Sequence, residues 1–115
     1  MREHHYYVYM IMSSSRRALY TGVTNNLKRR LRQHRSGEFG GFGGKYHCYR
    51  LVWFERYEDI RNAIEREKQI KDWRREKKEW LIDRVNPARR DLSADWGQPQ
   101  EYVAPFFMNG ASQNR

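Results

Sequence analysis

Residues 6–23 of the chain read YYVYMIMSSSRRALYTGV, and this stretch decides the fold. Residues 6–12 form an apolar and aromatic run of strand length without polar alternation, which is typical of a strand covered on both faces. Residues 13–17 contain turn-forming serines, and a second short strand-like run follows over 18–23. We therefore predict that the two runs pair as an antiparallel hairpin.

The sequence after the hairpin predicts helices and one more strand. Asn25 or Asn26 can cap a helix that runs to about Arg35. The remaining expected elements are one strand and two helices, over residues 49–55, 59–72 and 75–85. The order β-β-α-β-α-α predicts a small α/β (α+β) domain, in which helices pack against a sheet of few strands.

The pattern fades toward the C-terminus. Residues 97–115 contain Gly, Pro, Asn, Gln and Ser without a period, so we expect one domain over 1–92 and a loosely ordered tail over 93–115. Aromatic residues such as Trp96 leave open that part of the tail docks on the domain. The glycine-rich loop 37–44 is not followed by the Gly-Lys-Ser/Thr of a phosphate-binding loop, and no small-molecule cofactor is expected.

The charge balance favours a polyanionic partner. The chain has 115 residues, a net charge of +9 and a pI of about 10.0, which suit a single domain that binds nucleic acid or an acidic membrane surface. No apolar run approaches the roughly 20 residues that span a bilayer, so a membrane partner is not expected. Cys48 is the only cysteine, which excludes an internal disulfide and is consistent with a reducing, cytoplasmic location.

Polar side chains fall on helix faces that should point inward. Arg30 and His34 share one face of the first helix with two leucines. Glu67 lies at the centre of an apolar stripe on the next helix, whereas Glu65 lies on the opposite side. A carboxylate on an apolar face is costly unless it is paired or binds a metal. The pattern therefore leaves two explanations open, an internal salt bridge between Glu67 and Arg30 or a functional site.

Two tyrosines could extend that site. Tyr9 lies in the first strand and Tyr20 in the second, where a hairpin would bring them close. Either residue alone fits ordinary strand packing. Gly22 follows two residues after Tyr20 and would permit a close approach at the end of the strand, just before the basic helix.

Taken in order, these residues resemble the GIY-YIG nuclease superfamily. The resemblance rests on Tyr7-Val8-Tyr9, on Tyr20-Thr21-Gly22 and on several longer runs: LYTGVTNNLKRRLRQH, GFGGKYHCYRLVWFE, AIEREKQIKDWRREKKEWLI and NPARRDL. It covers roughly residues 6–92. The chain looks most like the small, stand-alone bacterial branch, and it is also similar to the N-terminal incision domain of the bacterial excision-repair nuclease. Arg89-Arg90 departs from the bulky aromatic that relatives carry at this point, so the last helix must pack differently here.

The resemblance implies a three-stranded antiparallel sheet flanked by helices and a metal-dependent endonuclease that hydrolyses DNA. Tyr20 matches the candidate general base, Tyr9 a residue that positions the nucleophile, and Arg30 the arginine that contacts the scissile phosphate. Glu67 matches the ligand of one Mg²⁺ or Mn²⁺ ion. His34 and Asn86 match further residues near the site. An unperturbed tyrosine titrates near pH 10, so a tyrosine base needs nearby cations such as Arg30 or Lys45.

A basic surface beside the proposed site would track phosphates. It comprises Lys28, Arg29, Arg32 and Arg35. The expected substrate is single-stranded or branched DNA, cut with structural rather than sequence preference in repair or recombination, because no separate recognition domain is visible. Two alternatives remain open: a non-catalytic nucleic-acid-binding module that keeps the fold, and a basic accessory protein of a nucleoprotein complex. The sequence leaves the oligomeric state open.

Overall fold

The first two strands form the predicted hairpin. The computed structural model of the protein describes residues 5–36 and 49–96. Strand β1 (Tyr6–Ser13) pairs antiparallel with β2 (Leu19–Thr24). The turn is closed by Ser13, whose backbone N–H donates to the Ala18 carbonyl at 3.0 Å and whose hydroxyl accepts from the Ala18 N–H at 3.1 Å.

A third strand completes the sheet. Strand β3 (Tyr49–Tyr57) pairs antiparallel with the other side of β1, so the strand order is β2-β1-β3 and β2 is an edge strand. A bulge interrupts the β1–β3 register: Met10 pairs with Trp53 but Ile11 pairs with Leu51. Val52 is the extra residue, and it packs in the same buried cluster as Trp53. The expected three-stranded antiparallel α+β architecture is confirmed.

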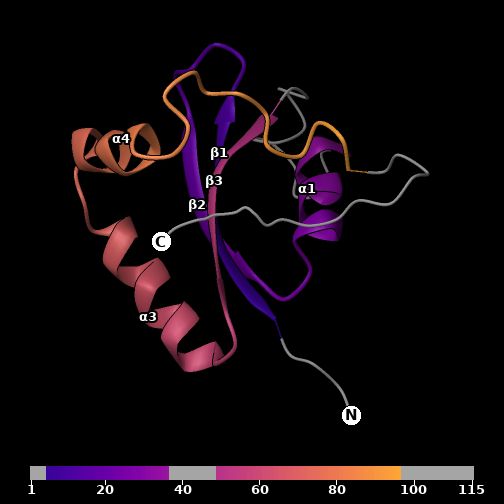
Figure 1. The fold of residues 1–115 in the computed structure, drawn as a ribbon, viewed down its shortest axis with the longest axis vertical. Helices are drawn as coiled ribbons and strands as arrows, with labels where there is room; N and C mark the ends of the chain where they lie inside the picture. Colours follow the sequence, from indigo (N-terminus) through magenta and orange to yellow (C-terminus); the bar gives the residue numbers. More distant parts are fainter. Residues whose placement is uncertain (1–4, 37–48, 97–115) are drawn as a thin grey trace.

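Three helices flank the sheet in the described part of the chain: α1 (Leu27–Ser36), α3 (Ile60–Lys71) and α4 (Arg75–Asp83). The side chain of Asn26 caps α1 by accepting from the Arg29 N–H at 3.0 Å, and Asp59 caps α3 by accepting from the Arg61 N–H at 2.9 Å. Helices α3 and α4 lie on one face of the sheet and α1 lies on the other (Figure 1). None of these helices is long and apolar enough to cross a membrane.

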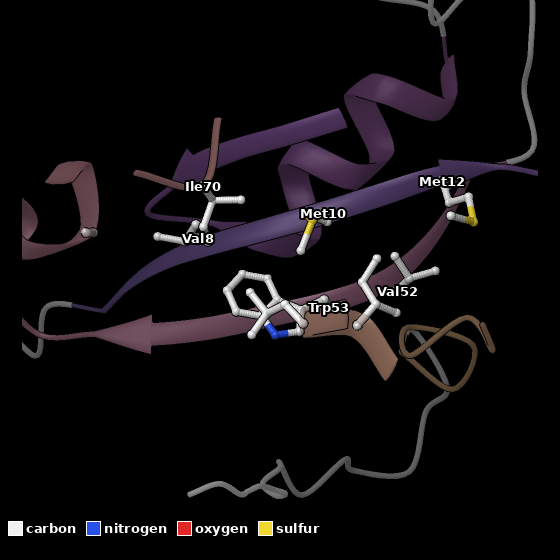
Figure 2. Close-up of a cluster of buried hydrophobic side chains, with 9 residues drawn as sticks. Val8, Met10, Met12, Val52, Trp53 and Ile70 are labelled. Atoms are coloured by element: carbon white, nitrogen blue, oxygen red, sulfur yellow. The ribbon is translucent and has the colours of Figure 1, made fainter. Parts of the chain in front are cut away.

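Strand β1 divides the core into two clusters. Its even-numbered residues Val8, Met10 and Met12 pack toward α3 and α4 with Trp53 and Ile70 (Figure 2). Its odd-numbered residues pack toward α1, in a cluster of Tyr9, Ile11, Leu27, Leu31, Tyr49 and Leu51. This strand is therefore covered on both faces, as its continuous apolar run predicts.

The segment after α4 crosses from the α4 side of the sheet to the α1 side (orange in Figure 1). Asp91 anchors it by accepting from the Leu51 N–H at 3.2 Å, and the Leu92 N–H donates to the Leu51 carbonyl at 2.8 Å. The Trp96 ring packs edge-on against Phe54, with 6.1 Å between centroids. Packing thus reaches Trp96, four residues beyond the domain boundary predicted at residue 92, while the rest of the predicted tail lies outside the described residues.

Arg89, one of the two arginines that depart from the family pattern, holds this segment in place. Its backbone has the left-handed φ of 58°, and its side chain is only 9% exposed. The guanidinium pairs with Glu79 at 2.5 Å and with Asp83 at 2.6 Å, both on α4. Ion pairs therefore bind the last helix to the crossing segment in place of ring packing.

Candidate active site

The candidate site begins with the pairing of β1 and β2. Gly22 lies directly opposite Tyr9 in the register. A Cβ atom at Gly22 would lie 2.5 Å from the Tyr9 hydroxyl and 2.7 Å from its Cζ, which is too close for real atoms. The missing side chain therefore lets the Tyr9 ring lie across the edge strand. The predicted close approach at Gly22 is present.

Three rings from three elements pack together above this point. The Tyr9 hydroxyl lies 3.1 Å from Nε2 of His34 on α1, in a buried contact. The Tyr20 ring lies 5.0 Å from the His34 ring and 6.4 Å from the Tyr9 ring, measured between centroids. The hairpin thus brings the two tyrosines together, and His34 joins them.

Burial disfavours the ionised form of Tyr9. This residue is 0% exposed, and burial raises its pKa to about 12 although the positive charge and hydrogen bond of Arg30 act in the opposite direction. A phenol that resists ionisation is a poor base at neutral pH. Tyr20 is partly exposed, so it is the tyrosine of the pair that a substrate can reach.

Arg30 reaches the site from the inward face of α1. Leu27, Leu31 and His34 on that face are buried, which agrees with the predicted helix face, and Arg30 is partly exposed. Burial and the charge of Arg30 lower the pKa of His34 to about 4. His34 is therefore a neutral ring at physiological pH, able to exchange one hydrogen bond with Tyr9.

Glu67 approaches from α3, which packs against both β1 and β2. Its side chain is only 12% exposed, and its charge influences the ionisation of Tyr9. Oε2 of Glu67 lies 2.6 Å from Nζ of Lys71, one turn further along α3. The salt bridge considered in the sequence analysis was between Glu67 and Arg30, whereas the structure pairs Glu67 with Lys71.

Four of the sequence-predicted residues meet at this edge of the sheet. Arg30, Tyr20 and Glu67 all contribute to the electrostatic environment of Tyr9, although the four residues come from α1, β2, α3 and β1. The arrangement combines a reachable phenol, a cation and a carboxylate around one buried tyrosine. Such a set can bind a phosphate group and a hydrated metal ion.

Asn86 lies apart from this group. Its side-chain amide donates to the Val52 carbonyl at 3.1 Å and to the Arg90 carbonyl at 2.9 Å, and its Oδ1 accepts from the Arg90 N–H at 3.0 Å. Val52 belongs to β3, which β1 separates from β2. Asn86 therefore anchors the crossing segment, and this geometry does not bring it into the predicted site.

The predicted basic surface is only partly exposed to solvent. Lys28, Arg29 and Arg32 are exposed on α1. Arg35 instead binds within the fold: its Nη2 pairs with Asp91 at 3.3 Å, and its Nε donates to the Tyr49 carbonyl at 3.1 Å. The expectation that Arg35 faces phosphates is corrected accordingly, and Lys45 lies outside the described residues.

Sequence reasoning missed Lys71 as a member of the site. The available signal was the Glu-to-Lys spacing of four residues, which favours a pair on one helix face.

Comparison with known proteins decides the family. A model of the GIY-YIG catalytic domain matches residues 5–79. The chain belongs to the GIY-YIG family. This assignment implies a nuclease with DNA as its substrate, and GIY-YIG nucleases generally use a divalent metal ion.

The GIY-YIG relatives of similar size are small stand-alone proteins. The chain is 41% identical over 87 residues to a UPF0213 protein of Haloquadratum walsbyi, an alignment that covers 72% of this chain and 91% of that protein. It is 42% identical over 80 residues to a UPF0213 protein of Clostridium perfringens, covering 66% and 81%. The solution NMR structure of a UPF0213 protein from Bacillus halodurans has the same GIY-YIG-like fold, with a TM-score of 0.51 and 25% identity over 81% of this chain and 97% of that one.

Proposed function

We propose that the protein is a metal-dependent endonuclease that hydrolyses DNA phosphodiester bonds at the edge formed by β2, α1 and α3. The observation that carries this proposal is the meeting of Tyr20, Arg30 and Glu67 around the buried Tyr9. A module that only bound nucleic acid would need surface cations, but it would have no use for a nearly buried carboxylate beside the tyrosines.

The chemistry of the reaction assigns a role to each side chain. A phosphodiester repels an attacking hydroxide, and negative charge grows on its oxygens in the transition state. The guanidinium of Arg30, on the inward face of α1, offsets this charge. Tyr20 is the group that faces the substrate and takes a proton from the nucleophile. Tyr9 and His34 hold the Tyr20 ring in place through the buried contacts of the three-ring cluster.

The donor set suits a hard divalent ion. Mg²⁺ keeps much of its water shell and is commonly held by one or two carboxylates together with substrate phosphate. Glu67 supplies such a carboxylate, and no group of three or more His, Cys, Asp or Glu side chains gathers anywhere in residues 5–36 and 49–96. Glu67 would therefore hold one Mg²⁺ or Mn²⁺, which when bound supplies Lewis-acid stabilisation of the phosphate charge.

The surface beside the site favours recognition by shape. Lys28, Arg29 and Arg32 can contact phosphates, and phosphate contacts fix position without reading base sequence. We therefore propose that the enzyme selects DNA by its structure, single-stranded or branched, and not by its base sequence. Such selectivity suits a role in repair or recombination.

The decisive experiment is a cleavage assay with end-labelled single-stranded, duplex and branched DNA and the matching RNA, in Mg²⁺, Mn²⁺ or EDTA. We expect metal-dependent cleavage that Glu67→Gln lowers at least about 100-fold, the usual scale for losing an electrostatic group of this kind. Glu65→Gln is the matched control, because Glu65 is an exposed carboxylate on the same helix. Salt-sensitive binding without cleavage in any metal would favour the non-catalytic alternative.

The two tyrosines are expected to differ in the same assay. Tyr20→Phe removes the substrate-facing hydroxyl and should lower kcat by about 100-fold or more. Tyr9→Phe removes the hydrogen bond to His34 but keeps the ring, so its effect on kcat should be smaller. Full cleavage by Tyr20→Phe would exclude this tyrosine as the base.

A further inference from the structure

The ion pair between Glu67 and Lys71 differs in kind from the others in the fold. Lys71 is 50% exposed along its side chain, whereas Glu67 is 12% exposed, so the ammonium reaches a nearly buried carboxylate from solvent. In the remaining ion pairs between described residues the cation is arginine, as in Arg66 with Glu55 or Arg35 with Asp91. Among the ion pairs between described residues, Glu67, the proposed metal ligand, is thus the carboxylate whose partner is a lysine.

Lysine and arginine bind a carboxylate with different firmness. A guanidinium holds a carboxylate through a rigid, planar fork, whereas an ammonium is a compact and strongly hydrated charge on a flexible stem. Lys71 can therefore leave Glu67 and be solvated without a change in the backbone of α3. Arginine at this position would hold the carboxylate more firmly.

A nearly buried carboxylate also needs a countercharge whenever no other cation is present. Lys71 supplies it within a favourable Glu-to-Lys spacing of four residues. The lysine lies close enough to Tyr20 for the two to interact electrostatically. Its ammonium lies 2.6 Å from Oε2 of Glu67, so an ion bound to that oxygen would have to displace it.

We propose that Lys71 is a positioning residue that occupies Glu67 in the metal-free protein and competes with the divalent ion for this carboxylate. The inference rests on the proposed function, because it takes Glu67 as the metal ligand. Lys71 holds the Glu67 carboxylate through the 2.6 Å ion pair, and it withdraws into solvent when the ion binds. The affinity of the site for the divalent ion is therefore lower than it would be if Glu67 had no lysine partner.

The test is calorimetric titration of the full chain with Mn²⁺ in the absence of nucleic acid. Lys71→Met should bind Mn²⁺ about 5-fold more tightly, because one competing and repelling charge is removed from a partly screened position. Lys71→Arg should bind about 5-fold more weakly, because the guanidinium fork holds Glu67 more firmly. Lys68→Met is the matched control: it removes the same charge from an exposed neighbouring position and should stay within about 2-fold of wild type.

The outcomes separate this inference from the proposed function. If wild type binds Mn²⁺, Glu67→Gln does not, and Lys71→Met binds no more tightly than Lys68→Met, the competition is overturned and the metal site stands. If neither wild type nor Lys71→Met binds Mn²⁺, the metal site at Glu67 is overturned and the inference falls with it. Methionine has a helix propensity similar to that of lysine. The variants Lys71→Met and Lys68→Met should therefore both remain folded, which thermal unfolding checks.

Discussion

The hydroxyl of Tyr9 lies 3.1 Å from Nε2 of His34, and this buried contact joins β1 to α1 at the centre of the candidate site. Neither residue faces solvent: Tyr9 is 0% and His34 is 4% exposed. Burial opposes charge on both, raising the pKa of Tyr9 to about 12 and lowering that of His34 to about 4. The contact is therefore a neutral one at physiological pH, and it joins the Tyr9 ring to the ring of His34.

Acid should weaken the fold through His34. The pKa of this histidine is about 4 in the folded protein and near 6.5 in the unfolded chain, so the unfolded state binds more protons between these values. The contribution of His34 to the free energy of unfolding is fully present above pH 6.5. It falls by about 2–3 kcal/mol as the pH drops toward 4. Urea unfolding at pH 7.0 and pH 4.5 measures this loss. The variant His34→Gln should show a smaller difference between the two pH values, and an equal difference would contradict the assignment.

Substitution of Gly22 should disturb the site through Tyr9. A Cβ at this position would lie 2.5 Å from the Tyr9 hydroxyl, so Gly22→Ala must displace the ring. We expect a loss of about 1–3 kcal/mol in the free energy of unfolding, the usual cost of overpacking, and a clear loss of cleavage. In a Tyr9→Leu background the shorter side chain leaves room, so the same change should cost less. Equal costs in both backgrounds would show that the effect of Gly22→Ala does not act through Tyr9.

The parts of this fold that sequence predicts are those encoded by local patterns. The apolar run of β1, the cap at Asn26 and the inward face of α1 follow from residues close together in the chain. The burial of the apolar stripe on α3 that contains Glu67 was predictable only in part. Ala63 and Ile70 on this stripe are 0% exposed, but Ile64 is 37% exposed. A helix period shows which side chains share a stripe, but it does not show how much of that stripe the sheet covers.

Long-range pairing accounts for the rest. The run of cations on α1 does not distinguish Arg35 from Arg32, because the partner of Arg35 is Asp91, 56 residues away. Similarly, Arg89 departs from the aromatic residue expected in its position, and the compensation by Glu79 and Asp83 appears only when α4 is folded. Family resemblance assigns Asn86 to the site, whereas its contacts in the structure are with the backbone of β3 and of the crossing segment.

Asn86 should matter for stability more than for chemistry. Asn86→Ala removes two donated hydrogen bonds and one accepted hydrogen bond, leaving the buried Val52 carbonyl and the part-buried backbone groups of Arg90 without these partners. We expect a loss of about 2–3 kcal/mol in the free energy of unfolding, with kcat preserved at temperatures where the variant is folded. Thermal unfolding, and cleavage assayed well below each unfolding midpoint, measure the two effects separately. A fall in kcat without a change in stability would instead support the role near the site that the resemblance implies.

The exposed cations of α1 should set the salt dependence of DNA binding. Lys28, Arg29 and Arg32 are exposed, and each phosphate contact contributes about 0.7–0.9 to the slope of log K against log salt concentration. Single changes of these residues to Gln should lower the slope by up to that amount, whereas Arg74→Gln, at the exposed start of α4 on the other face of the sheet, should leave it unchanged. Arg35→Gln should act differently, lowering the free energy of unfolding by about 1–2 kcal/mol because Asp91 loses the cation that pairs with it. Fluorescence anisotropy across a salt series, with urea unfolding of each variant, distinguishes the two classes. A slope that responds equally to Arg74 and Arg32 would place the phosphate-binding surface elsewhere than α1.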